Sequence, residues 1–295
     1  MKLKNSITSL RLNKLSAAFA VLLFICTVFR TLQMLFFIEP ETGFNTGPSW
    51  LMVLFYILIS GGCFVLSLIS FLSKETAELD LDGVKSKAIS VSSFVFAATL
   101  LYDWFCCIFE GVSSYAVVQV GSGFKGLMSS GFLTGTLQSF FAFFSMIYFV
   151  VLGFDMKRGT RIASQKFKIM ALAPVGWASV RLVHRFISQI SFLEVSDLFL
   201  ELLMLSFTVM FFMAFAQVVS GVNSTGFSWR LYGFGSSAAM ISVTVNISRS
   251  IVVLIKGSSA LNPSYMPEIA DIAFAVFIIM LIGEFVRYRK FVEEV

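Results

Sequence analysis

The sequence has few charged residues for its length. Of its 295 residues only 13% are Asp, Glu, Lys or Arg, whereas 57% are hydrophobic. A soluble domain usually carries about 25% charged residues, and too much of a small domain is surface for such an apolar excess to be buried in its core. The 35 Phe residues are equally unfavourable in water. The composition therefore excludes an ordinary soluble domain and indicates a protein surrounded by lipid.

Metal-binding and catalytic motifs are also missing. The four cysteines, Cys26, Cys63, Cys106 and Cys107, fall in apolar runs without CxxC spacing or a Cys/His ligand pattern. We therefore expect no metal site and no cofactor. The chain has one histidine and no GxSxG nucleophile motif, and it lacks the acid pair of CAAX proteases and the Ser/His set of rhomboid proteases. We expect that the protein is not an enzyme.

Eight apolar segments are long enough to cross a bilayer. A helix needs about 20 apolar residues to span a hydrocarbon core of about 30 Å. The expected spans lie near 15–38, 49–73, 88–110, 133–154, 168–190, 197–220, 232–256 and 267–287. The alternating pattern of an outer-membrane barrel is absent from these runs. The predicted fold is all-α: a single polytopic transmembrane bundle over 1–295, built of four antiparallel hairpins, with no soluble domain.

Positive charge alternates between the predicted loops. The N-terminus, the even-numbered loops and the C-terminus carry most of the Lys and Arg, including Lys157 and Arg158, whereas the odd loops carry mainly acids such as Glu39 and Glu194. Because Lys and Arg are enriched in cytoplasmic loops, we expect both termini in the cytoplasm and the chain in the cell membrane. This bias also explains the net charge of +5, so we expect lipid and no nucleic acid as a partner.

Ionisable residues are expected within the outer half of the membrane. A charge at the bilayer centre costs about 2.5–3.5 kcal/mol on insertion scales, so such residues normally face the bundle interior and pair. Arg181, His184 and Arg185 share one face of the fifth span because they stand at i, i+3 and i+4. The candidate ligand-binding residues are Arg30, Asp103, Arg181, His184, Arg185, Glu201, Arg249, Glu268 and Asp271.

Two interpretations of this set remain open. In the first, the arginines line an outward-facing cavity of a small transporter or permease and bind an anionic or zwitterionic solute. In the second, four arginines and four acids form a closed network of structural ion pairs, and the protein is a sensor, an assembly factor or a partner of other membrane subunits. A water-accessible cavity reaching Arg181 and Asp103 would favour the first interpretation. For His184, the alternatives are a proton shuttle and a hydrogen-bonded neighbour of the acids.

Two helix-disrupting residues fall inside the fifth predicted span. Pro174 and Gly176 precede Arg181 by about two turns. Proline removes a backbone hydrogen bond and can kink a helix, whereas glycine lets two helices approach closely. We therefore expect either a kink in this span or close packing against a neighbouring helix.

Overall fold

Almost all of the chain whose structure is described is helical. The computed structural model describes residues 2–39, 45–72, 85–117, 132–160, 163, 166–188, 195–220, 228–257 and 266–294. Within these ranges the helices are α1 (Lys2–Phe36), α2 (Ser49–Leu72), α3 (Lys87–Val117), α5 (Phe132–Arg158), the short 3-10 helix η2 (Ile169–Leu172), α7 (Ala173–Ser188), α8 (Val195–Val219), α9 (Ser228–Lys256) and α10 (Ile269–Glu294). The prediction of an all-α chain with eight α-helices is confirmed for these residues.

Six of the described helices are long and apolar enough to cross a membrane, namely α1, α2, α3, α5, α8 and α9. Large apolar side chains are exposed on their outer surfaces. Phe24 on α1 is 70% exposed, Phe64 on α2 is 67% exposed and Phe109 on α3 is 73% exposed. Lipid, rather than water, is the solvent in which such a surface is stable. The six helices therefore support an integral membrane protein embedded in a bilayer.

The expected spans near 168–190 and 267–287 are not among these six helices. The eighth corresponds to α10, with 26 residues, whereas the fifth is divided into η2 and the 16-residue α7. At about 1.5 Å per residue, α7 covers only about 24 Å. Pro174 lies in the first turn of α7, a position where its missing N–H costs no hydrogen bond. The proline therefore stands near the start of a short helix and does not kink a long one.

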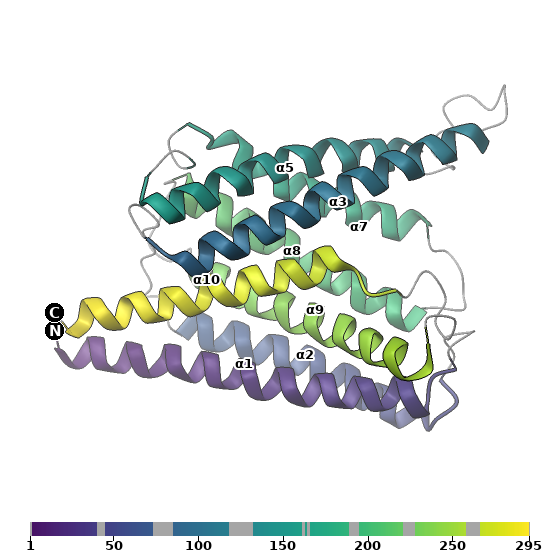
Figure 1. Ribbon diagram of the computed structural model, residues 1–295. Coiled ribbons are helices and arrows are strands. Elements are labelled where there is room, and N and C mark those ends of the chain that lie inside the picture. The colour runs from purple at the N-terminus through teal and green to yellow at the C-terminus, as the bar shows by residue number, and fades with distance from the viewer. Residues whose placement is uncertain are drawn as a thin grey trace.

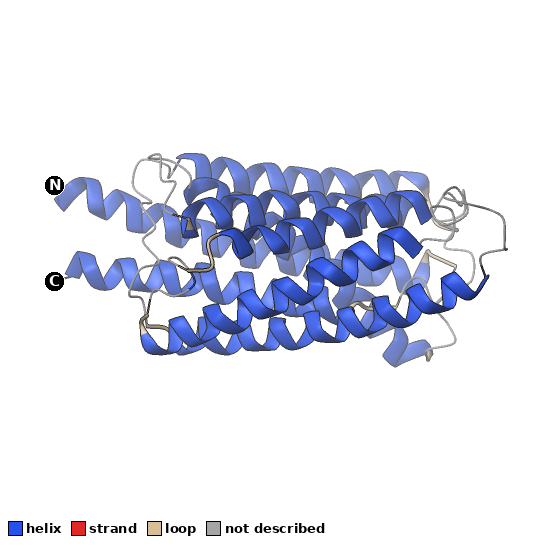
Figure 2. Ribbon diagram, turned by 90° about the horizontal axis from the view of Figure 1, so that it is seen from above, coloured by secondary structure: helices blue, strands red, loops and turns tan. Residues whose placement is uncertain are grey.

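The helices lie side by side along a common direction, and the start of α1 and the end of α10 lie at the same end of the molecule (Figures 1 and 2). The central helix is α9, which contacts α1, α2, α8 and α10. Small residues permit this packing: a Cβ atom at Gly235 would lie 2.9 Å from the ring of Phe211, and one at Gly233 would lie 3.3 Å from the Cα atom of Ser67. The sequence of α9 thus suits a helix surrounded by others.

An aromatic core fills the space between α3, α5, α8 and α10. The ring of Phe96 packs edge-to-face on Phe149, with centroids 4.7 Å apart, and also contacts Phe212, Phe274 and Phe277. Such ring pairs contribute about 0.5–1.5 kcal/mol each beyond area burial. Phe96 precedes Asp103 by seven residues on α3, which is about 10 Å at 1.5 Å per residue. The aromatic core therefore lies between Asp103 and the end of the bundle that carries the termini.

Candidate functional site

Arg181 is the centre of a buried group of charges at the end of the bundle opposite the termini. Its Nη1 donates to Asp271 Oδ1 at 2.7 Å, and its Nη2 donates to Asp271 Oδ2 at 3.2 Å and to Glu268. Its guanidinium also lies over the ring of Trp177, one turn earlier on α7, 4.8 Å from the ring centroid. The Arg181 side chain is only 7% exposed. Its charge is therefore balanced by the carboxylates of Glu268 and Asp271, and the Trp177 ring adds a cation–π contact.

The same group of charges continues to α8 and α9. Arg185 donates to Glu268 through Nη2 and to Glu201 Oε2 through Nε, at 3.2 Å in the second case. The other carboxylate oxygen of Glu201 accepts from Arg249 Nη2 at 2.7 Å. We call Arg181, Arg185, Glu201, Arg249, Glu268 and Asp271 the charged network. It joins α7, α8, α9 and the start of α10.

Polar residues of α9 hold the beginning of α10 in this network. Asn246 Oδ1 accepts from the backbone N–H of Glu268 at 2.8 Å, and Ser242 Oγ donates to the backbone carbonyl of Asp271 at 2.8 Å. Asp271 stands in the first turn of α10, where the helix dipole favours a negative charge. These backbone contacts fix the position of Asp271 and of Glu268, which directly precedes α10, so that both carboxylates face Arg181.

Asp103 lies outside the charged network and is held by neutral donors. Trp177 Nε1 donates to its Oδ2 at 2.7 Å. Gln138 Nε2 lies 3.4 and 3.3 Å from its two oxygens, and Cys107 Sγ lies 3.9 Å from Oδ1. Among the described residues, no cationic side chain forms an ion pair with Asp103. Trp177 and Gln138 were not predicted as site residues, although a buried indole N–H needs an acceptor.

The two other candidates have partners outside the charged network, although His184 lines the same cavity as Arg181 and Arg185. His184 Nδ1 forms a hydrogen bond of 2.7 Å with Thr134 Oγ1 on α5, so its described partner is not an acid of the network. Arg30 on α1 is buried, donates to Gln33 Oε1 at 3.3 Å and lies over the ring of Phe55. No hydrogen bond or ion pair joins Arg30 to the described acids of the candidate set. The reason is that α1 packs mainly against α2 and α9, which carry none of the candidate acids.

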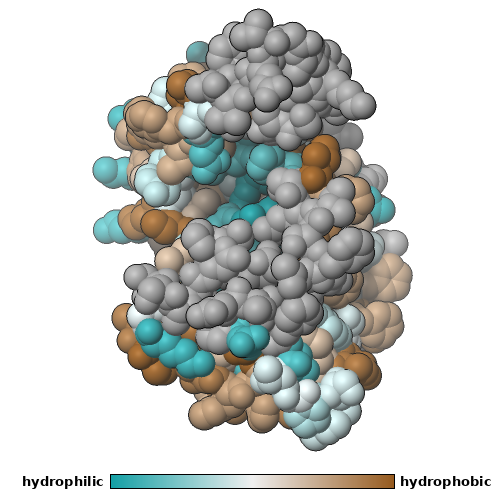
Figure 3. Space-filling view, turned by 90° about the vertical axis from the view of Figure 1, so that its right-hand side faces the viewer, coloured by the Kyte–Doolittle hydropathy of each residue, from teal (hydrophilic) through white to brown (hydrophobic). Residues whose placement is uncertain are grey.

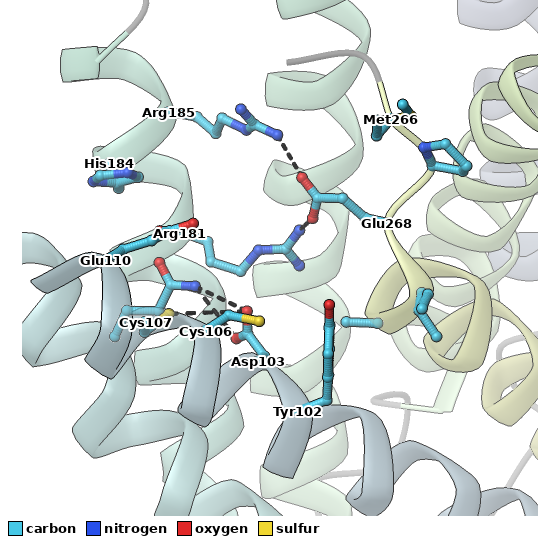
Figure 4. A pocket seen from close by; sticks show the side chains of 14 residues that line it. Tyr102, Asp103, Cys106, Cys107, Glu110, Arg181, His184, Arg185, Met266 and Glu268 are labelled. Atoms are coloured by element: carbon cyan, nitrogen blue, oxygen red, sulfur yellow. Dashed lines mark hydrogen bonds and ion pairs between the residues drawn. The ribbon is translucent and has the colours of Figure 1, made fainter. Parts of the chain in front are cut away.

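A cavity of about 430 Å³ lies beside the charged network, between α3, α5, α7 and the start of α10. Figure 4 shows Tyr102, Asp103 and Cys106 extending from α3 on one side, with Arg181 and Arg185 from α7 on another. Viewed from this end of the molecule, hydrophilic residues lie in a hollow (Figure 3). The volume falls in the range of about 300–1,000 Å³ that is typical of small-molecule sites.

Glu110 also lines this cavity, although it is not among the candidate residues predicted from the sequence. It stands at i+7 from Asp103, so both residues lie on one face of α3. The predicted third span ended at residue 110, whereas α3 continues to Val117. The predicted span bounds give no sign that Glu110 lines a site, although its i, i+7 spacing from Asp103 is visible in the sequence.

Six long apolar helices are compatible with an integral membrane protein, and the charged cavity lies at one end of these helices. Comparison of the chain with protein-family models, with curated protein sequences and with solved structures found no match. The geometry of the cavity is therefore the basis on which a function can be proposed.

Proposed function

We propose that the protein is a small transporter-like membrane protein whose cavity binds a zwitterionic solute. The observation that carries this proposal is the cavity wall, which has charges of both signs: Arg181 and Arg185 from α7, and Asp103 and Glu110 from α3. Charged groups within a membrane protein commonly belong to a substrate pathway. A solute with both charges finds a partner of opposite sign for each end.

Arg185 is the group best placed for the anionic end of the solute. Its side chain is 22% exposed, whereas that of Arg181 is 7% exposed. A guanidinium has five N–H donors, and the described partners of Arg185, Glu201 and Glu268, use only Nε and Nη2. The two N–H groups of Nη1 are thus placed to bind a carboxylate. A purely anionic solute is disfavoured because it would meet Asp103 and Glu110 across the cavity.

The distribution of charge in the loops predicts the side of the membrane to which this cavity opens. With both termini in the cytoplasm, as the distribution of Lys and Arg predicts, the cavity opens to the outside. The aromatic core around Phe96 then separates it from the cytoplasmic end. This arrangement is the one that alternating access requires of an outward-facing state.

Uptake by the reconstituted protein tests the proposal. Proteoliposomes that contain the full chain are expected to accumulate radiolabelled amino acids from a mixed pool above the level of protein-free liposomes. Arg185→Gln should lower the initial rate about tenfold or more, because the variant loses a charged contact to the solute carboxylate. The control Arg230→Gln changes an exposed arginine at the other end of the bundle and should leave uptake unchanged. Uptake no greater than that of protein-free liposomes would contradict the proposal.

A second function is favoured by the charged network itself. Each of its carboxylates contacts at least one guanidinium, as expected for charges that hold helices in register. In that case the protein is a sensor, an assembly factor or a partner of other membrane subunits. Arg185→Gln would then lower the yield of folded protein, and no solute in the pool would change the thermal stability of the wild-type chain.

A further inference from the structure

Among the described residues, the charges around the cavity are not balanced. The sequence alone predicts four arginines against four acids, but in the structure Arg30 lies apart and Glu110 joins the site. The carboxylates of the cavity and network are those of Asp103, Glu110, Glu201, Glu268 and Asp271, and the guanidinium groups are those of Arg181, Arg185 and Arg249. Negative charges therefore outnumber positive ones among the described residues of this site, and an excess charge within a membrane is costly.

The excess negative charge lies on α3. Glu201, Glu268 and Asp271 each contact a guanidinium of the network. In contrast, neither Asp103 nor Glu110 forms an ion pair with any described residue. The donors to Asp103 are an indole, an amide and a thiol, which hold the carboxylate in place without neutralising it.

We infer that Asp103 and Glu110 form the subsite for an ammonium group of the solute. This inference rests on the proposed function and specifies which wall of the cavity the cationic end meets. Tyr102 adjoins Asp103 on α3 and extends toward the same space (Figure 4), where its ring offers a face that attracts cations. A solute bound across the cavity thus has its ammonium group at α3 and its carboxylate at Arg185.

The composition of the wall favours an organic cation over a metal ion. Within the part of the chain that the structure describes, no group of three or more His, Cys, Asp or Glu side chains is arranged to hold a metal. Calcium requires about six to eight oxygen ligands, and magnesium requires a near-octahedral set. A cavity of about 430 Å³ is also far larger than a metal site, and it has room for an amine with its carbon skeleton.

Cys106 provides a probe of this subsite that needs no knowledge of the solute. It lines the cavity beside Asp103, and it is the only thiol left when Cys26, Cys63 and Cys107 are replaced by Ser. The purified full-length variant is treated with a cationic trimethylammonium methanethiosulfonate or with an anionic sulfonate analogue. The rate at which each reagent modifies Cys106 is divided by the rate at which it modifies a free thiol in solution, which corrects for the different reactivities of the reagents. We expect a ratio of cationic to anionic rates of about ten or more, because a charged cleft concentrates ions of opposite sign.

Substitutions of the two α3 carboxylates test whether they cause this preference of Cys106 for the cationic reagent. Asp103→Asn and Glu110→Gln should each lower the ratio, and together they should bring it close to one. Asp103→Glu keeps the charge and should keep the ratio. Glu284→Gln removes a carboxylate about 20 Å along α10 from Asp271 and should have no effect. Size-exclusion chromatography checks that each variant is folded.

The outcomes separate this inference from the proposed function. Equal normalised rates, or a ratio that Asp103→Asn does not change, would overturn the ammonium subsite even if the protein transports amino acids. A cation preference without amino-acid uptake would uphold the subsite and contradict the transporter. If neither reagent modified Cys106, the cavity would be closed to solutes and both proposals would be wrong.

Discussion

At the scale of single residues, Glu201 illustrates how one carboxylate joins several helices. Its Oε1 accepts from Arg249 on α9 at 2.7 Å, and its Oε2 accepts from Arg185 on α7 at 3.2 Å. The Glu201 side chain is only 8% exposed. Removing one member of a buried ion pair leaves the other charge uncompensated in a medium of low dielectric constant. Glu201 therefore stabilises the relative positions of three helices.

We predict that Glu201→Gln lowers the free energy of unfolding by about 3–5 kcal/mol, because the neutral amide leaves two guanidinium groups without their shared carboxylate. Denaturant titration in mixed micelles measures this change. Glu39→Gln is the matched control at an exposed glutamate, where a change within about 0.5 kcal/mol is expected. Equal stabilities of the two variants would show that the charged network does not stabilise the fold.

At the scale of secondary-structure elements, the close packing of α7 on α5 positions the site. A Cβ atom at Gly176 would lie 2.5 Å from Cδ1 of Phe141, so only glycine permits this approach. The next residue, Trp177, donates to Asp103, and Arg181 follows one turn later. Of the two expectations for this span, a kink or close packing, the packing at Gly176 is the one observed.

Gly176→Ala is expected to destabilise the protein by about 1–3 kcal/mol, because the added methyl group must displace an aromatic ring. Thermal unfolding of the purified protein measures the effect. Gly61→Ala in α2 is the control: nothing lies within 4 Å of its added Cβ atom, and alanine is favoured over glycine in a helix by up to about 1 kcal/mol. An unchanged melting temperature for Gly176→Ala would mean that Phe141 moves aside freely.

At the scale of the whole molecule, α3 begins and α5 ends near the end that carries both termini (Figure 1). The basic residues Lys85 and Lys87 stand at the start of α3 in the sequence, and Lys157 and Arg158 stand at the end of α5. The opposite end contains the cavity and the start of α10. Since cytoplasmic segments are enriched in Lys and Arg, this distribution supports the proposed orientation.

Reporter fusions test this orientation. A fluorescent protein that folds only in the cytoplasm should be active when fused after Val295 or inserted near Gly159, and alkaline phosphatase should be inactive there. After Gly257, in the segment that follows α9, the two reporters should give the reverse result. If the reporters placed the Gly159 and Val295 fusion points on opposite sides of the membrane, the predicted topology would be wrong. The proposal that the cavity opens to the outside would then lose its support.

The positions of the helices were largely predictable, because a run of about 20 apolar side chains has few stable alternatives to a membrane-spanning helix. The second span was expected at 49–73 and is observed at Ser49–Leu72. The predicted ends of the spans were less accurate where a helix continues beyond its apolar run. The first span was expected at 15–38, whereas α1 covers Lys2–Phe36, and α3 extends to Val117. Hydropathy detects contact with lipid and is insensitive to a helix that continues outside it.

The sequence by itself determined that the chain is helical and apolar and that its few buried charges need partners, because those properties depend on composition and local spacing. Which charges meet was decided only by the tertiary structure. Arg249 shares Glu201 with Arg185, Arg30 lies apart, and Glu110 joins Asp103 at the cavity. The physical reason is that pairing across helices depends on which helices are neighbours and how each is rotated, and packing of small residues such as Gly176 and Gly235 decides both.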